Sequence, residues 1–229
     1  MPKGKLLINT INAFSYNNAR KDALFAEALT KGDVLIPDGI SIVKACRWLK
    51  AKSQPVERIA GWDLFEYEMQ QLHAIATASA RKRVMFMGSS EHVLELIRKK
   101  AAEQYPLLDV ITYSPPYKAE FSDDDNRAII SAINQAQPDL LWIGMTAPKQ
   151  EKWAYSHWAE LNIHCHVGTI GAVFDFFAGT YQRAPLWWQQ HGLEWLYRLL
   201  KEPRRMWRRY ILGNAEFLMY VMKEKRSIA

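Results

Sequence analysis

The sequence predicts an α/β protein with a Rossmann-like, mostly parallel sheet flanked by helices, followed by a C-terminal helical appendage rich in basic and aromatic residues. Up to about residue 170, short β-rich runs alternate with helical patterns, which is typical of βαβ units. From residue 185 the strand pattern stops and a Trp- and Arg-rich helical sequence follows. We therefore expect an α/β domain over residues 1–190 and an amphipathic helical appendage over residues 191–229.

Six apolar runs account for the expected strands. They are KLLINT at 5, VLIPD at 34, RVMFMG at 83, LDVITY at 108, LLWIGM at 140 and IHCHVG at 163. The helices between them are expected at roughly residues 18–30, 40–51, 62–80, 90–104, 122–136 and 148–161. Ser122 is a good helix start, because the acids at 123–125 favour the positive end of the helix dipole.

Composition indicates one main folded core. The 229 residues are 49% hydrophobic and include nine Trp, which is enough to bury one substantial core. The two cysteines, Cys46 and Cys165, lack metal-ligand spacing, and the N-terminus does not resemble a secretory signal. These features favour a cytoplasmic location. No apolar run approaches the ~18 residues that would span a bilayer, so we expect no transmembrane segment.

The positive charge is concentrated in the appendage. The segment 194–229 holds nine Lys and Arg against four Glu, so +5 of the net charge of +6 lies there. This asymmetry indicates an anionic partner, which could be phospholipid, a diphosphate group or nucleic acid.

The last helix is expected to be amphipathic, with Pro203 in its first turn. Arg205 and Arg209 are expected to point away from its apolar face. Such a helix either lies at a membrane interface or packs on the rest of the protein. The face itself is expected to contain Trp207, Tyr210, Ile211, Asn214, Phe217, Leu218 and Val221.

Asp38 is the first candidate for chemistry. In the stretch DVLIPDGISIV, residues 33–43, it follows an apolar run, at the end of a strand where α/β sheets bind ligands. A carboxylate followed by glycine, here Gly39, can cap the next helix. The functional alternative is a general base, because a partly desolvated carboxylate can take a proton from a hydroxyl.

Two further helix starts could bind an anion. Gly88 and Ser89 stand between a strand and a helix, where free N–H groups can hold phosphate, although an ordinary tight turn has the same pattern. Lys149 and Gln150 follow Pro148 in a first helical turn. A lysine is electrostatically disfavoured there, which indicates either a bound anion or a solvated turn.

Asp175, His164 and His166 can each be explained by a structural role as well as by a functional one. Asp175 lies among aromatics, and Arg183 is the nearest downstream cation, so the two could form a structural ion pair or serve catalysis. His164 and His166 could face the same side of a strand, but isolated histidines in a core or on a surface are more common than metal ligands. We predict no metal site.

Six motifs, in order along almost the whole chain, resemble the WecG/TagA/CpsF group of bacterial glycosyltransferases, glycosyltransferase family 26. They are T-x-N at Thr10 and Asn12, PDGISIV, ERIAGWDL with Arg58 and Asp63, MTAPKQEKW, FDFFAGTYQRAP and GLEWLYRLLKEPRRMWRR. One departure is Thr146, where the family usually has glycine.

The resemblance implies an enzyme that transfers a sugar from a UDP donor to a polyprenyl-diphosphate-linked saccharide in bacterial cell-surface polysaccharide synthesis. The sugar would be of the N-acetylmannosamine type, or a related hexose or uronic acid. The transfer would be inverting and independent of metal or other cofactors. It would take place on an anionic membrane surface, with the enzyme peripheral on the inner face of the cytoplasmic membrane.

The resemblance also assigns the role of base to Asp38. Direct displacement with inversion needs one group that deprotonates the attacking hydroxyl, and a single carboxylate suffices. Without a metal, arginines and helix N-termini must stabilise the leaving diphosphate. The expected substrate contacts, from these motifs and the helix-start patterns together, are Thr10, Asn12, Gly39, Arg58, Gly88, Ser89, Lys149, Gln150, Arg198, Arg205 and Arg208.

The alternative is a nucleotide-binding α/β protein of other chemistry, whose basic tail binds a membrane or nucleic acid. A dinucleotide fingerprint is absent, and the tail contains no recognised nucleic-acid motif, so we expect no nucleic-acid partner. A homo-oligomer is also possible, because the Trp-rich tail could bury its apolar side chains against a second subunit.

Overall fold

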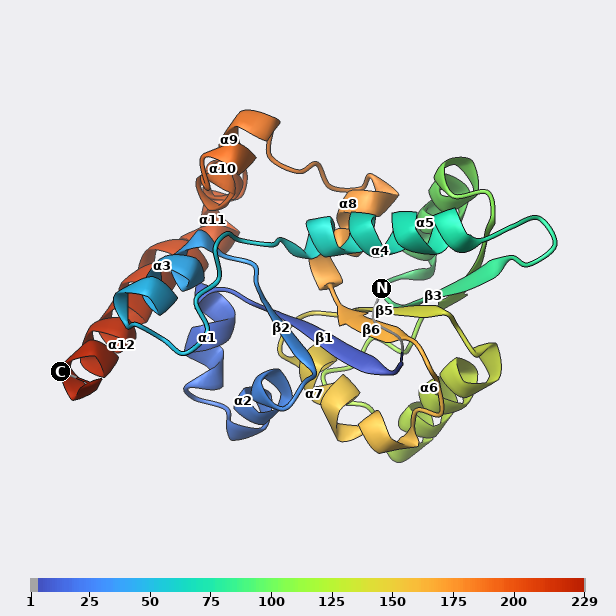
Figure 1. The fold of residues 1–229 in the computed structure, drawn as a ribbon, viewed down its shortest axis with the longest axis horizontal. Coiled ribbons are helices and arrows are strands. Elements are labelled where there is room, and N and C mark those ends of the chain that lie inside the picture. Colours follow the sequence, from blue (N-terminus) through green and yellow to red (C-terminus); the bar gives the residue numbers. More distant parts are fainter. Residues whose placement is uncertain (1–3, 229) are drawn as a thin grey trace.

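The protein forms a six-stranded, fully parallel sheet with helices on both faces (Figure 1). The computed structural model describes residues 4–228, without the side chains of Arg205 and Ile228. The sheet order is β2-β1-β6-β5-β3-β4. The strands are β1 (Leu6–Ile11), β2 (Val34–Pro37), β3 (Lys82–Gly88), β4 (Leu108–Tyr113), β5 (Leu140–Gly144) and β6 (His166–Thr169). This confirms the predicted fold class.

Eight α-helices and one short 3₁₀ helix (Trp158–Glu160) accompany the strands within residues 4–180. They are α1 (Ala13–Ala19), α2 (Ala23–Thr30), α3 (Ile40–Trp48), α4 (Gly61–Ile75), α5 (Glu91–Gln104), α6 (Asp123–Ala136), α7 (Lys149–Ser156) and α8 (Gly171–Ala178). The helix expected over 18–30 is in fact two helices. Asp22 interrupts it, because its carboxylate accepts the backbone N–H of Phe25 at 3.0 Å and so starts α2.

The two faces of the sheet have separate cores. On one face α4, α5 and α8 cover a cluster that includes Phe65, Phe86 and Phe177, with the Phe65 and Phe177 ring centroids 4.8 Å apart. On the other face α6 and α7 cover Met85 and Met87. Phe86 and its neighbours on β3 alternate between the faces because side chains of a strand point to opposite sides. Both cores are built from long-range contacts.

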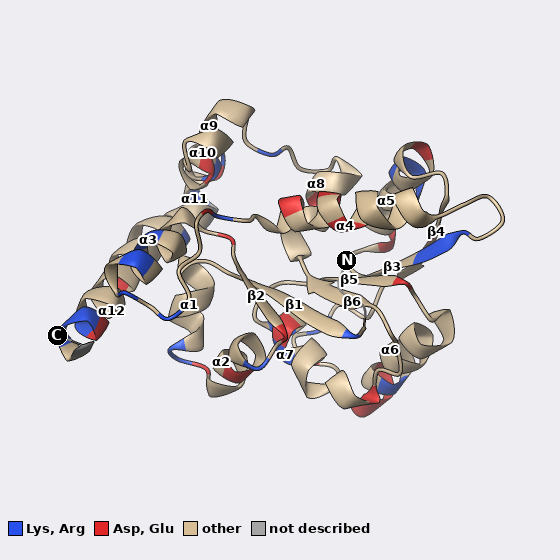
Figure 2. Cartoon of the chain, viewed as in Figure 1, with Lys and Arg blue, Asp and Glu red and all other residues tan. Residues whose placement is uncertain are grey.

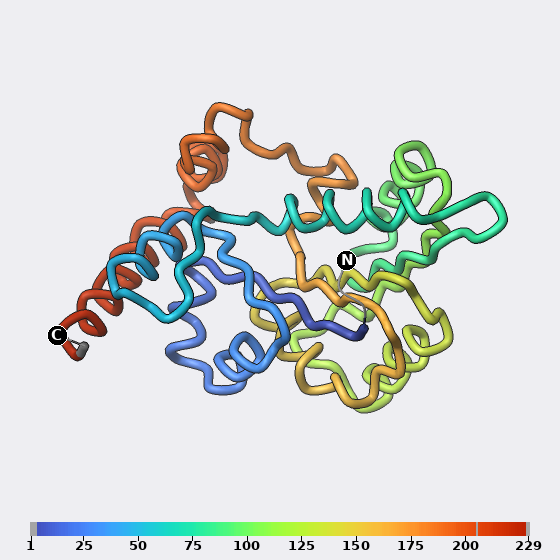
Figure 3. The backbone as a smooth tube through the Cα atoms, in the orientation of Figure 1, coloured from blue at the N-terminus to red at the C-terminus, as the bar shows by residue number. Residues whose placement is uncertain are grey.

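The chain after α8 passes through α9 (Leu186–Gln190) into the appendage, whose last helix, α12 (Gly213–Ile228), runs along α1 and α3 at the side of the sheet (Figure 3). The other elements of the appendage are α10 (Glu194–Lys201), α11 (Pro203–Trp207) and a π-helical turn (Arg208–Leu212). Pro203 begins α11, as expected. Phe217 and Val221 of α12 are buried in a small cluster with Ala13 and Ile42.

The predicted apolar face of the last helix is only partly correct. Phe217 and Val221 are buried, but Trp207, Ile211 and Leu218 are 43%, 52% and 56% exposed. In the described part of α12, only a narrow side packs on the body, and successive residues of a helix point about 100° apart, so Leu218 faces solvent although its neighbour Phe217 is buried.

Arg209 also differs from its expected place, because its guanidinium lies over the ring of Phe14 on α1, at 4.3 Å from the centroid. It therefore packs on the body of the protein and does not point away from it.

Opposite charges attach α12 to α1, and several other cations of the appendage are exposed. Glu224 accepts the Tyr16 hydroxyl at 2.6 Å and pairs with Arg20 at 2.8 Å, and Glu216 pairs with Lys21 at 2.5 Å. Figure 2 marks the positions of acidic and basic residues along this segment. The exposed cations there include Arg204, Arg208, Lys223 and Arg226. Across residues 4–228, each helix is too short or too polar to span a bilayer.

Candidate active site

Asp38 lies at the carboxyl end of β2, the strand at one edge of the sheet. Its Oδ1 accepts the backbone N–H of Gly61 at 3.3 Å, and its Oδ2 accepts the side-chain amide of Asn12 at 3.4 Å. The capping hypothesis for the next helix is wrong, because Gly39 is the N-cap of α3 and no side chain bonds there. The carboxylate turns instead towards the first residue of α4.

The environment of Asp38 suits a general base. The pKa of this carboxyl is raised from 3.8 to about 6. Loss of hydration is the main cause, and the charge of Glu194 acts in the same direction. The Asn12 amide, the Arg58 charge and the Gly61 N–H act in the opposite direction. The group is therefore ionised near neutral pH and still basic enough to accept a proton.

Asn12, which follows the neighbouring strand β1, is brought beside Asp38, and Thr10 lies on that strand. In the β1–β2 register Thr10 is paired with Ile36, and the half-buried Asn12 follows the end of β1. Asn12 is also the N-cap of α1, with its Oδ1 accepting the Ser15 N–H at 3.1 Å. This bond orients the amide so that its NH₂ group faces Asp38.

Arg58 lies beside Asp38 and makes an ion pair with the appendage. Its guanidinium is 3.5 Å from Oε2 of Glu194, the first residue of α10, and Arg183 approaches the same oxygen at 3.7 Å. The three side chains are only 15–21% exposed. Glu194 was not predicted as a site residue, because an acid in the first turn of a helix is common. Its partner Arg58 is 136 residues away in the sequence.

The three appendage arginines have different surroundings. Arg198 of α10 lies over Phe176 and Tyr181, with its guanidinium 5.5 and 5.9 Å from the ring centroids. Arg208 is exposed and lies over the neighbouring Trp207. Arg205 belongs to α11, but its side chain is outside the described part of the chain. Among the described side chains of the three arginines, only that of Arg198 is seen close to Arg183: it lies over Phe176, whose ring contacts the Trp62 ring under Arg183.

Gln150 is buried and bridges two loops at the carboxyl edge of the sheet. Its Oε1 accepts the N–H groups of Met145 and Gly171, at 3.0 and 3.1 Å, and its amide donates to Glu151 at 2.8 Å. Gly171 permits this approach, because a Cβ there would overlap the Met145 carbonyl oxygen. Gln150 therefore joins the loop after β5 to the start of α8, and positions both around the site.

Lys149 and the Gly88–Ser89 turn also lie at the carboxyl ends of strands, but beside other strands than Asp38. The Lys149 ammonium donates to the Lys118 carbonyl at 2.5 Å and lies 3.4 Å from the centroid of Phe121, in a cavity of about 330 Å³. Gly88 ends β3, four strands from β2, which is about 19 Å at the usual spacing between strands. The structure does not bring these residues to Asp38.

Gly88 has a structural role in this turn. Its φ is +123°, and a Cβ there would overlap the Gly144 carbonyl oxygen at the end of β5. Ser90 then caps α5 by accepting the Val93 N–H at 3.4 Å.

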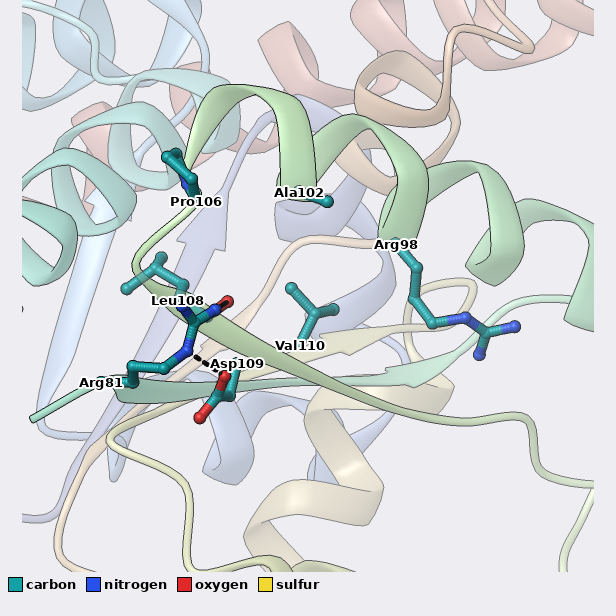
Figure 4. Close-up of a pocket in the computed structure, with 7 residues that line it drawn as sticks. All are labelled: Arg81, Arg98, Ala102, Pro106, Leu108, Asp109 and Val110. Atoms are coloured by element: carbon teal, nitrogen blue, oxygen red, sulfur yellow. Dashed lines mark hydrogen bonds and ion pairs between the residues drawn. The ribbon is translucent and has the colours of Figure 1, made fainter. Parts of the chain in front are cut away.

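A second cavity, of about 340 Å³, lies by the outer strand β4, and no predicted site residue lines it (Figure 4). Arg81 and Asp109, which form an ion pair at 2.5 Å, belong to this cavity at the amino ends of β3 and β4. The cavity is therefore at the opposite end of the strands from Asp38.

The two histidines proposed as a pair do not face the same side. His164 is exposed, whereas His166 is buried and its Nδ1 lies 3.1 Å from both carboxylate oxygens of Glu68. Over residues 4–228, no group of three His, Cys, Asp or Glu side chains could hold a metal ion.

Comparison with known proteins gives the family of this chain. The model of the family "Glycosyl transferase WecG/TagA/CpsF family" matches residues 1–229. The chain is 29% identical to the N-acetylglucosaminyldiphosphoundecaprenol N-acetyl-beta-D-mannosaminyltransferase of Bacillus subtilis over 221 residues, which cover 96% of this chain and 80% of the relative.

Enzymes of the same name in two other bacteria are similarly related. The Bacillus spizizenii enzyme is 29% identical, over 99% of this chain and 82% of the relative, and the Staphylococcus aureus enzyme is 28% identical, over 97% and 82%. These matches confirm the resemblance found in the sequence motifs. The chain belongs to the WecG/TagA/CpsF family of glycosyl transferases.

Proposed function

We propose that this glycosyltransferase moves a sugar of the N-acetylmannosamine type, or a related hexose or uronic acid, from a UDP donor to a polyprenyl-diphosphate-linked saccharide for bacterial cell-surface polysaccharide synthesis. The names of the relatives support this acceptor and sugar. The observation that carries the proposal is the single Asp38 carboxylate at the carboxyl edge of the sheet, with a raised pKa and the Arg58 guanidinium beside it.

Asp38 is the proposed base of an inverting displacement. The acceptor hydroxyl attacks the anomeric carbon and gives its proton to Asp38 as the new bond forms. The bond between that carbon and the diphosphate oxygen breaks, and its electron pair leaves on UDP. Asn12 and the Gly61 N–H keep the carboxylate oriented during this step, because each holds one of its two oxygens.

Cationic side chains are proposed to stabilise the leaving diphosphate without a metal ion. Arg58 and Arg198 supply fixed positive charge around the site, and an arginine can bind two phosphate oxygens at once. Transfer is therefore expected to continue in excess chelator. A loss of activity that is restored by Mg²⁺ or Mn²⁺ would contradict this part of the proposal.

The appendage over residues 191–229 is proposed to hold the enzyme on the inner face of the cytoplasmic membrane. It exposes large apolar side chains, among them Ile211, Leu212, Leu218, Met219 and Met222. Exposed arginines and lysines accompany them, and each cation near an anionic bilayer contributes about 1 kcal/mol. This combination fits a peripheral membrane protein whose acceptor is itself in the lipid.

The function is tested by ligand binding followed by turnover. A set of UDP-sugars is first screened for an increase in the melting temperature of the protein. The sugars that bind are then incubated with the protein and a synthetic polyprenyl-diphosphate N-acetylglucosamine, and the mass of the lipid product is measured. Addition of one sugar residue supports the proposal, and binding of UDP-sugars without any transfer contradicts it.

A further inference from the structure

Arg183 has no role in the displacement described above, although it lies beside the residues that do. It follows α8, and its guanidinium approaches the same carboxylate oxygen of Glu194 as Arg58 does. Arg58 is 136 residues from Glu194 in the sequence, whereas Arg183 is close to it along the chain, and all three side chains are largely buried. Two arginines that converge on one point form a site for an anion.

The contacts with Glu194 leave this anion site incompletely filled. The two distances, 3.5 and 3.7 Å, exceed the 2.7–2.9 Å that is usual for a charge-assisted hydrogen bond. In addition, the Nε–H groups of Arg183 and Arg198 are buried without a hydrogen-bond acceptor. A buried donor without an acceptor is unfavourable. The site thus offers more donors than one carboxylate can accept from.

Aromatic rings hold these guanidinium groups in place. Arg183 lies 5.5 Å from the centroid of the Trp62 ring, and Arg198 lies over Phe176 and Tyr181. The Trp62 and Phe176 rings are themselves in contact, with centroids 6.5 Å apart. Stacking fixes the plane of a guanidinium and leaves the N–H groups at its edge free to bind oxygen atoms.

The site adjoins the proposed base. Trp62, under Arg183, directly follows Gly61, whose N–H bonds to Asp38. Arg58 and Glu194 both act electrostatically on Asp38, so they are close to it. An anion bound here would lie next to the carbon that reacts.

We propose that Arg183 binds the diphosphate of the donor together with Arg58, and that the Glu194 carboxylate occupies this position until the donor displaces it. The inference rests on the proposed function, because it names the residues that bind the leaving group of that reaction. A diphosphate carries more charge and more oxygens than a carboxylate, so it can pair with both arginines and also accept the free Nε–H of Arg183. Rotation of the Glu194 side chain about its own bonds would release the position.

The test measures binding of UDP, uridine and inorganic diphosphate to the full chain by titration calorimetry or ligand-observed NMR. Arg183→Gln is expected to weaken binding of UDP and of inorganic diphosphate about tenfold, because it removes a charged donor, and to leave uridine binding unchanged. Glu194→Gln is expected to tighten binding of both anions several-fold, because the competing charge is gone. The matched control is Arg81→Gln, which removes another paired arginine at the opposite end of the strands and should change neither.

The outcomes separate this inference from the proposed function. If Arg183→Gln binds diphosphate and UDP as the wild type does, or if Glu194→Gln binds them more weakly, the inference fails even when the wild type transfers sugar. If the wild type binds inorganic diphosphate through Arg183 but transfers no sugar to any polyprenyl-diphosphate acceptor, the anion site stands and the proposed function fails. A wild type that binds neither anion overturns the inference directly.

Discussion

The α/β body and the C-terminal appendage are held in place by different interactions. In the body, β5 is buried along its whole length, and aromatic rings from α4 and α8 pack on one face of the sheet. Among its described residues, the appendage buries few apolar side chains, namely Met206, Phe217 and Val221, and ion pairs and hydrogen bonds add to its contacts with α1.

Because of this difference, the body alone determines most of the stability, whereas the candidate site needs residues from both regions. Buried apolar area stabilises a fold strongly, whereas partly exposed ion pairs such as Arg20–Glu224 each contribute only about 0–1 kcal/mol. The body should therefore keep its structure when the appendage is lost or detached. The site should not, because Glu194 and Arg198 come from the appendage and Asp38 comes from the body.

Removal of the appendage is expected to have the largest effect on activity. A chain that ends before Glu194 is expected to lose sugar transfer and liposome binding, because it lacks the tail cations and the exposed apolar residues. Its melting temperature should stay within a few degrees of the wild type, since the body cores are intact. Calorimetry, liposome co-sedimentation and a turnover assay check this, with a chain shortened only by residues 223–229 as the control. Unchanged turnover in the shorter chain would refute the role of the appendage.

Asp38→Asn tests the contribution of the body to the site. Loss of the base is expected to lower the rate of transfer by about 10²–10⁴, with UDP-sugar binding retained. The wild-type rate should fall about tenfold per pH unit below pH 6, because the pKa of Asp38 is raised to about 6 and only the ionised group accepts a proton. Asp123→Asn, an exposed acid at the start of α6, is the matched control. A pH-independent rate between pH 4.5 and 7 would exclude Asp38 as the base.

A matched pair of phenylalanine variants compares the two regions directly. Phe65→Ala in the body should lower the global free energy of unfolding by about 3–5 kcal/mol, because it leaves a cavity in the main core. Phe217→Ala, which is equally buried in the appendage, should change it by less than about 1 kcal/mol and speed hydrogen exchange in α12 alone. Denaturant titration and amide exchange measure both. Equal losses of global stability would mean that the two regions unfold as one unit.

Glu151→Gln is expected to change the stability of the body in a way that depends on pH. Burial raises the pKa of Glu151 from 4.5 to about 7, so the folded protein holds this carboxyl in its neutral form and is destabilised as it ionises. The stabilising contribution is thus complete below pH 4.5 and lost as the pH rises to 7. Glutamine should therefore stabilise the protein by up to about 3 kcal/mol at pH 8 and not at pH 4.5. Thermal melts at both pH values check this, and an equal shift at both would contradict it.

Local patterns were enough to predict most of the elements. Each strand coincides with a predicted apolar run, and the Ser122 start of α6 is confirmed, with its Oγ accepting the Asp125 N–H. There are two exceptions: Asp22 divides one predicted helix, and, of the last helix as far as it is described, only the Phe217 and Val221 side is buried. The first depends on a single capping residue and the second on which side of α12 meets the body, and an average over a window of sequence resolves neither.

The candidate site was predicted in part. Asp38, Asn12 and Arg58 were identified from strand ends and motifs, and the structure brings them together. Gln150 was expected to contact substrate, but its amide is used inside the protein. The sequence pattern could not distinguish these roles, because a polar residue after a strand has the same pattern whether it faces a ligand or a loop.

The sequence alone determined the alternation of strands and helices, the carboxylate at the end of β2 and the basic, aromatic tail, since these depend on neighbouring residues. Only the tertiary structure decided that Asp38 bonds to the start of α4, that Arg58 and Arg183 converge on Glu194, and that Phe217 is buried while Leu218 is not. The physical reason is that such contacts join residues far apart in the chain. Their geometry follows from how whole helices pack on the sheet, and no short stretch of sequence contains it.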